Sequence, residues 1–277
     1  MIYLGLAGTV GGIYISQLYS KESKALNLLA YCFYTILAGL IGTISYFFIQ
    51  VGAFSENGLM GMIQQPYLSI LWQSNVSSVM LLQAAGFILA LGALALIQAN
   101  LLIYRKGKCA FYFLYIVSCL SIAASFPLSG HTTELNLFSQ FLLALHILMI
   151  SWWLGSLWPL WKLCQINDID KVKCLMEDFG RKAILMTGLL IVSGAVLAIE
   201  LVGDFESLFY SEYGQVLLTK IFFVSSMLLL AAQHKLWLVP QLKEKGLKTL
   251  SKSISIELLF ASLVLFSTLI LSTFVGP

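Results

Sequence analysis

The stretch that decides the fold is residues 137–161, which read LFSQFLLALHILMISWWLGSLWPLW. No Asp, Glu, Lys or Arg interrupts it, and it exceeds the roughly 20 apolar residues that an α-helix needs to cross a bilayer. A bilayer core holds no water to bond with backbone N–H and C=O groups, so a crossing chain folds into a helix, where these groups bond to one another. Residues 137–161 therefore predict a transmembrane helix.

Similar apolar runs lie on both sides of this stretch. Of the 277 residues, 59% are hydrophobic and 10% are charged, whereas a soluble domain has about 25% charged residues. The composition predicts an all-α, polytopic membrane bundle of about eight transmembrane helices, with residues 1–277 forming a single integral membrane domain. The eight predicted segments are 2–19, 28–50, 77–103, 110–126, 137–161, 183–202, 214–238 and 254–275.

Glycine is frequent in the first predicted segment. Gly8 and Gly12 stand four residues apart, so they share one face of a helix. Small residues at this spacing let two membrane helices approach closely. The pair therefore predicts close packing of another helix on this face.

The basic residues predict the orientation of the chain. All but one of the 16 Lys and Arg residues lie in or beside the loops that follow the first, third, fifth and seventh segments. By the positive-inside rule these four loops are cytoplasmic, so both termini are expected in the periplasm. The net charge of +3 thus follows from membrane orientation and gives no indication of a nucleic-acid partner.

His146 is the clearest candidate for chemistry, because it lies near the middle of the fifth segment, where a polar side chain is costly. Met149 follows three residues later, on the same helical face. An imidazole and a thioether together suit Cu(I), and the same two groups also ligate haem iron. The alternative is a hydrogen-bonded histidine beside a methionine that fills space. At this depth we favour the functional interpretation.

Three weaker candidates lie in loops predicted to be periplasmic. His131, in the loop after the fourth segment, could receive a metal ion, but on the residues alone an ordinary solvated histidine is the favoured interpretation. Met60 and Met62, in the loop 51–76, could collect Cu(I), but anchoring at the membrane interface is the simpler interpretation.

No nucleotide-binding loop, GxSxG or HExxH motif is present, and an enzyme is therefore the least favoured class.

Two charged residues fall inside predicted segments. Lys220 lies in the seventh segment, where it could snorkel outward or pair with Glu200 at the end of the sixth. Glu257 opens the eighth segment, where it could pair with Lys252 or His234, or serve as an exit ligand for a metal. For both Lys220 and Glu257 we favour structural pairing.

Several spaced motifs in the second half of the chain resemble those of the copper-resistance D (CopD) family of bacterial inner-membrane proteins. On this resemblance, residues 127–277 are the CopD-like core and residues 1–126 are less family-like. The motifs are Gly130-His131, Leu145-His146 with WLGSLWPL at 153–160, YGQVLLTK at 213–220 with Leu238-Val239-Pro240, and SIELL at 255–259.

The resemblance implies copper handling in a lipid bilayer, either import across the inner membrane or copper tolerance alongside a small periplasmic copper-binding protein. The resemblance implies that His131 and His146 bind copper as Cu(I). It also implies that Lys220 and Glu257 fall on positions of the family's motifs. The chain departs from the family in having Ser139 where members often carry a second histidine, and His234 where an asparagine is frequent.

Two other hypotheses stay open. The chain could be a haem-binding or electron-transfer membrane protein with His146 as an axial ligand. It could also be a membrane partner that docks a periplasmic copper-binding protein and transports nothing.

Overall fold

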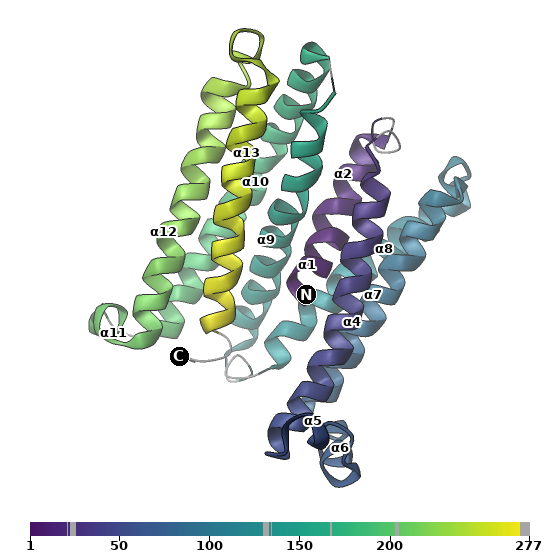
Figure 1. Ribbon diagram of the computed structural model, residues 1–277, viewed down its shortest axis with the longest axis vertical. Helices are drawn as coiled ribbons and strands as arrows, with labels where there is room; N and C mark the ends of the chain where they lie inside the picture. The colour runs from purple at the N-terminus through teal and green to yellow at the C-terminus, as the bar shows by residue number, and fades with distance from the viewer. Residues whose placement is uncertain are drawn as a thin grey trace. The chain divides into compact units, whose positions relative to one another are not determined.

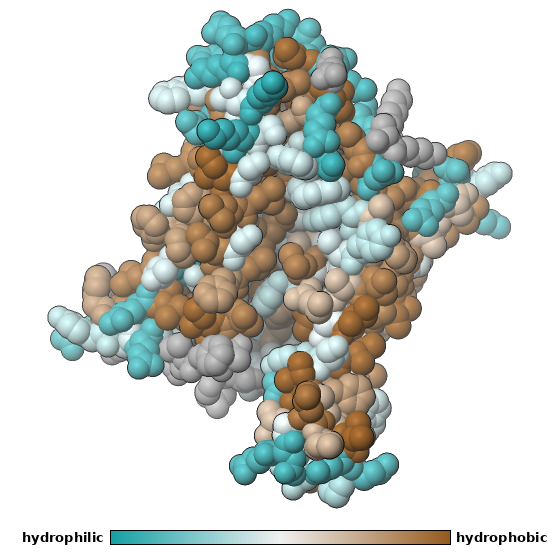
Figure 2. Space-filling view, in the orientation of Figure 1, coloured by the Kyte–Doolittle hydropathy of each residue, from teal (hydrophilic) through white to brown (hydrophobic). Residues whose placement is uncertain are grey.

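The computed structural model describes residues 1–20, 22, 26–129, 133, 135–166, 168–202 and 205–271 (Figure 1). In this part of the chain every regular element is a helix. Seven helices are long and apolar enough to cross a membrane, and the N-terminal helix, Ile2–Leu18, is shorter. Figure 2 shows hydrophobic side chains along the long helices and hydrophilic ones gathered at their ends. The prediction of an all-α, polytopic membrane protein is confirmed.

Each predicted segment corresponds to a helix. The N-terminal one consists of α1 (Ile2–Ala7), the π-helical turn η1 (Gly8–Gly12) and α2 (Ile13–Leu18). The long helices are α4 (Leu28–Phe54), α7 (Asn75–Gln98), α8 (Arg105–Ser125), α9 (Leu137–Leu163), α10 (Ile169–Val202), α12 (Glu212–Gln233) and α13 (Leu242–Ile270). Short helical turns join several of them, namely η2 (Leu101–Ile103), η3 (Phe126–Leu128), α11 (Phe205–Tyr210) and η5 (His234–Leu238).

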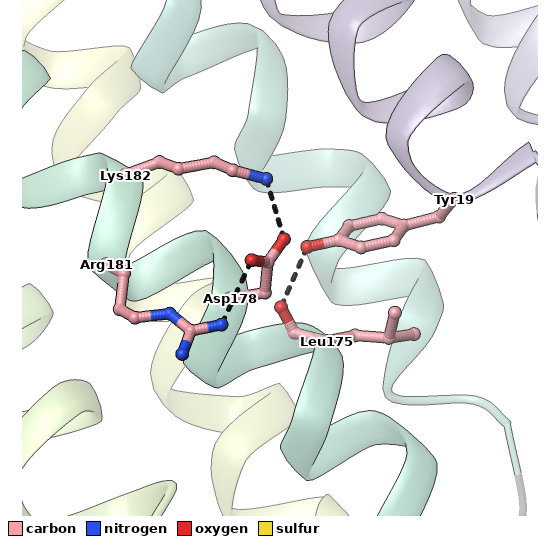
Figure 3. Close-up of polar contacts among 5 residues, drawn as sticks. All are labelled: Tyr19, Leu175, Asp178, Arg181 and Lys182. Carbon is pink, nitrogen blue, oxygen red and sulfur yellow. Dashed lines mark hydrogen bonds and ion pairs between the residues drawn. The ribbon is translucent and has the colours of Figure 1, made fainter.

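Helix α10 begins 14 residues before the predicted apolar segment, because charged pairs extend it. Asp178 accepts from Lys182 Nζ at 2.7 Å and from Arg181 at 3.3 Å (Figure 3). Lys173 and Glu177, four residues apart, approach within 3.9 Å. Pairs at these spacings stabilise a helix by a few tenths of a kcal/mol each. Hydropathy detects only the apolar part of such a helix, so the helix extends beyond the predicted apolar segment, which begins at residue 183.

Helix α13 likewise begins before its predicted start at residue 254. Gly246 interrupts it with a φ of 77° and a ψ of 160°, values that glycine adopts without steric cost. The helix then continues to Ile270.

The loop predicted over residues 51–76 contains two short helices, α5 (Gly58–Gly61) and α6 (Gln65–Trp72). Phe47, Val51 and Leu71 form a buried apolar cluster where this segment meets the end of α4. The cluster holds the loop in a defined conformation against the helix that precedes it.

The chain divides into two compact units. Unit one comprises residues 1–18 and 27–155, and unit two comprises residues 19–26 and 156–277. The boundary falls inside α9, which contributes to both units. The sequence predicts that residues 1–277 form a single membrane domain. Because that depends on how the two units are joined, it stays a prediction.

In unit one, the N-terminal helix packs on α4 through small residues. Gly8 lies against Thr35, and a Cβ placed on Gly12 would lie 3.0 Å from the Tyr31 ring and 3.1 Å from the Cys32 sulfur. The close approach predicted from Gly8 and Gly12 is therefore confirmed, and α4 is the helix that makes it.

Among the described glycines of unit one, Gly155 of α9 makes the tightest contact with another backbone segment. A Cβ on Gly155 would overlap the carbonyl oxygen of Ala7. Four residues after Gly155 stands Pro159, inside the helix, which has no N–H to give to the Gly155 carbonyl. The Tyr31 hydroxyl donates to that carbonyl at 3.3 Å instead. The packing against Ala7 thus requires glycine here, and the Tyr31 hydroxyl supplies the hydrogen bond that Pro159 cannot.

In unit two, α13 packs against α12 and α10. The segment that leaves the N-terminal helix also joins α10. The Tyr19 hydroxyl donates to the Leu175 carbonyl at 2.7 Å (Figure 3), and Glu22 pairs with Lys171 at 2.6 Å. These contacts attach Tyr19 and Glu22 to the charged half of α10.

Gly155→Ala is expected to lower the free energy of unfolding by about 1–3 kcal/mol, because the added methyl group overpacks the contact with Ala7. Denaturant unfolding of the purified protein in detergent measures this. Gly188→Ala is the matched control, since a Cβ on this helical glycine of α10 meets nothing within 4 Å. Equal stability of the two variants would contradict the packing described for α9.

The predicted orientation is testable with cysteines that the chain already has. Cys109 and Cys174 are exposed beside basic residues, and the other three cysteines are buried. In intact spheroplasts a membrane-impermeant thiol reagent should leave Cys109 and Cys174 unlabelled until the membrane is permeabilised. Asn57→Cys, an exposed position in the loop before α5, should be labelled without permeabilisation. The reverse pattern would place both termini in the cytoplasm.

Candidate functional site

The structure places His146 and Met149 in α9, three residues apart and therefore on one face. Both side chains are half-buried. His146 lies nine residues beyond the start of α9, which at 1.5 Å per residue is about 13 Å along the helix. A polar ring and a thioether thus sit together deep within an apolar helix.

The loop candidates lie apart from this pair in the sequence. His131 lies outside the described residues. Met60 belongs to α5 and is 80% exposed. Met62 follows α5, and its side chain packs over Gly52 of α4. Within the described ranges, no three His, Cys, Asp or Glu side chains gather into a group that could hold a metal ion.

Lys220 lies half-buried inside α12. Glu200, near the end of α10, is exposed. In the part of the chain that the structure describes, no ion pair forms between Lys220 and Glu200. Snorkelling of Lys220, and its pairing with an acidic residue, both stay predictions.

Glu257 lies in a buried polar cluster of unit two. Its carboxylate is 2% exposed, and its Oε2 lies 3.3 Å from Nδ1 of His234. The other ring nitrogen of His234, Nε2, lies 2.7 Å from Oγ of Ser253, which is 8% exposed. Of the two partners considered for Glu257, the structure selects His234 over Lys252.

Local backbone geometry positions this cluster. His234 opens the π-helical turn η5, in which the Val239 N–H donates to the His234 carbonyl at 2.9 Å, five residues back. Such turns are rare and occur frequently at functional sites. Ser253 and Glu257 are four residues apart on α13, so they present both oxygens to the histidine from one face.

Sequence reasoning missed Ser253, because 19 residues separate it from His234. The four-residue spacing to Glu257 was the signal that could have found it. A serine, a histidine and a carboxylate in this order resemble the hydrogen-bonded row of a nucleophilic triad. Ser253 lies within a continuous helix, however, where neighbouring N–H groups bond to the helix itself and offer no oxyanion hole.

A second buried polar group, in unit one, was also missed. Gln83 of α7 accepts from Thr43 of α4 at 3.2 Å and donates to Ser125 of α8 at 3.0 Å. Hydrogen bonds of this kind join membrane helices. The glutamine within an apolar run was the signal available in the sequence.

The comparisons with known proteins gave one match. Residues 174–271 match the family described as copper resistance protein D, CopD. No curated protein and no solved structure matches the chain. The matched stretch contains the motifs at 213–220, 238–240 and 255–259, and it begins after His131 and His146. From Cys174 in α10 to Leu271 at the end of α13, this multi-pass membrane protein therefore carries the CopD family pattern, as the resemblance implied.

Proposed function

We propose that this protein serves copper homeostasis at the bacterial inner membrane, by importing copper or by conferring copper resistance. The family match supports a role related to copper resistance. The observation that carries the proposal is the placement of His146 and Met149 on one half-buried face of α9.

The depth of the pair supports a path across the membrane. A bilayer core is about 30 Å thick, so a position about 13 Å along α9 is close to its middle. A cation meets its greatest desolvation cost there, and ligands at that depth offset the cost. Imidazole and thioether groups favour Cu(I) among the metals available to a cell.

We propose His131, Met60 and Met62 as the residues that receive copper on the periplasmic side. Met60 is the most accessible of those that the structure describes, because its side chain is 80% exposed at α5. A small periplasmic copper-binding protein is the partner that would deliver copper to these residues.

Haem binding is the second candidate, because the same two side chains are haem ligands in other proteins. The two axial ligands of one haem approach from opposite faces of the ring. His146 and Met149 lie on one face of one helix, so they cannot both bind a single haem iron. This geometry favours copper.

Met149→Leu is expected to weaken Cu(I) binding more than about tenfold, since even residues that only support metal ligands change affinity by about that much. A competition titration with a chromogenic Cu(I) chelator measures the affinity of the purified protein. Met186→Leu is the matched control, because this half-buried methionine lies in α10. Equal affinity in the two variants and in His146→Ala would remove α9 from the copper path.

The haem alternative makes a separate prediction. Protein purified from cells supplied with haem is expected to show no Soret band, because a copper site built from His146 and Met149 leaves no haem ligand pair on α9. Absorbance spectroscopy of the wild type beside His146→Ala checks this. A Soret band that His146→Ala abolishes would favour electron transfer over copper handling.

A further inference from the structure

An open groove runs along the second half of α12 in unit two. Its walls come from α12, the turn η5 and Phe260 of α13, and it encloses about 520 Å³. Leu229 and Leu236 line it and are 72% and 67% exposed. Exposed apolar side chains are expected wherever a helix faces lipid tails, which are as apolar as leucine. The case for a particular ligand therefore depends on the polar groups of the groove.

Two hydrogen-bond donors lie at one end of the groove, which we call the donor end. They are the side-chain amide of Gln233 and the indole N–H of Trp237, and both side chains are exposed. Among the residues that the structure describes, neither group has a hydrogen-bond partner. An indole N–H only donates, and an amide N–H also donates. The donor end is thus suited to a ligand that is rich in acceptors.

The depth of the groove matches the inner half of one leaflet of the bilayer. Trp237 lies 25 residues beyond Glu212, the first residue of α12, which is about 37 Å along the helix. Because the hydrocarbon core is about 30 Å thick, the donor end lies at the level of the lipid headgroups, where tryptophan is enriched. Leu229 lies about 12 Å deeper, among the acyl chains. On the predicted orientation this leaflet is the cytoplasmic one.

A ridge on α13 brings a positive charge to the same end. Lys252, Ile256 and Phe260 stand four residues apart, so they form one ridge along the helix. Phe260 lines the groove. Ser253, the residue after Lys252, lies 2.7 Å from the His234 ring at the start of η5. Lys252 is therefore level with the donor end of the groove.

Positive charge is in excess at this end of α13. Lys252 and Lys248 are exposed, and neither forms an ion pair within the described ranges. Lys243 pairs with Asp170 of α10 at 2.7 Å. Glu244 is the acidic residue of the first turn of α13. Clusters of lysine beside a membrane helix attract anionic lipids.

We propose that the groove binds one anionic phospholipid of the cytoplasmic leaflet. Its phosphate group pairs with Lys252, and its ester oxygens accept hydrogen bonds from Gln233 and Trp237. One acyl chain lies along Leu229 and Phe260. Each part of the lipid thus meets a group of matching chemistry, in the order in which charge, acceptors and hydrocarbon follow one another in a phospholipid.

The test compares phosphatidylglycerol with phosphatidylcholine of the same acyl chains, in which the choline group cancels the charge of the phosphate. Native mass spectrometry of the full chain measures the affinity for each lipid. We expect phosphatidylglycerol to bind about fivefold more tightly, which is what one lysine contributes near an anionic lipid surface. Lys252→Gln should remove that preference. Lys106→Gln, at an exposed position of α8 in unit one, is the matched control and should leave it unchanged.

Tryptophan fluorescence locates the bound lipid and needs no lysine variant, so it decides the question if Lys252→Gln does not fold. Brominated acyl chains quench tryptophan, and the Trp237 signal is the difference between the wild type and Trp237→Phe. We expect brominated phosphatidylglycerol to quench this signal, and unbrominated phosphatidylglycerol to restore it at a lower concentration than phosphatidylcholine does.

Three results would overturn the proposal. They are equal affinity for the two lipids, equal losses in Lys252→Gln and Lys106→Gln, and a protein dimer whose Trp237 the brominated lipid does not quench. Because no copper is present in either measurement, the outcome is independent of the proposed copper function.

Discussion

Every backbone N–H and C=O in the bilayer core needs a partner within the protein, and the rest of this structure depends on that constraint. Because of this constraint, every crossing segment is a helix. Any backbone group that the helix leaves without a hydrogen-bond partner needs a partner from a side chain. Pro159 has no N–H to donate to the Gly155 carbonyl, and the Tyr31 hydroxyl donates to that carbonyl instead. At the π-helical turn η1, the Tyr115 hydroxyl donates to the Val10 carbonyl at 2.8 Å. Side chains thus complete the backbone bonding where the helices depart from regular geometry.

The patterns of hydropathy and charge were enough to predict the helices, because each pattern is averaged over many residues of a long segment. They did not predict the helix ends, because a few local contacts decide where a helix begins and ends. The charged half of α10 is held by pairs around Asp178, which a hydropathy profile treats as loop. Helix α13 begins at Leu242 and is interrupted at Gly246, whose conformation no periodic pattern contains.

The candidate site was predictable only in part, for a similar reason. His146 and Met149 lie three residues apart on one helix, so their shared face follows from helical geometry alone. The contact between His234 and Ser253 needs the turn η5 and the packing of α12 on α13, neither of which is encoded by spacing. A list of possible partners for Glu257 could be drawn from the sequence, but the choice among them required three-dimensional structure.

The boundary between the two compact units falls at Gly155 and Ser156. His146 and Met149 therefore belong to one unit, whereas His234, Ser253 and Glu257 belong to the other. Residues 174–271, the stretch that carries the family pattern, contain the second group and exclude the first. The proposed copper ligands and the buried pair of His234 and Glu257 are thus encoded in separate parts of the gene, so evolution could alter or discard either one while the other is inherited unchanged.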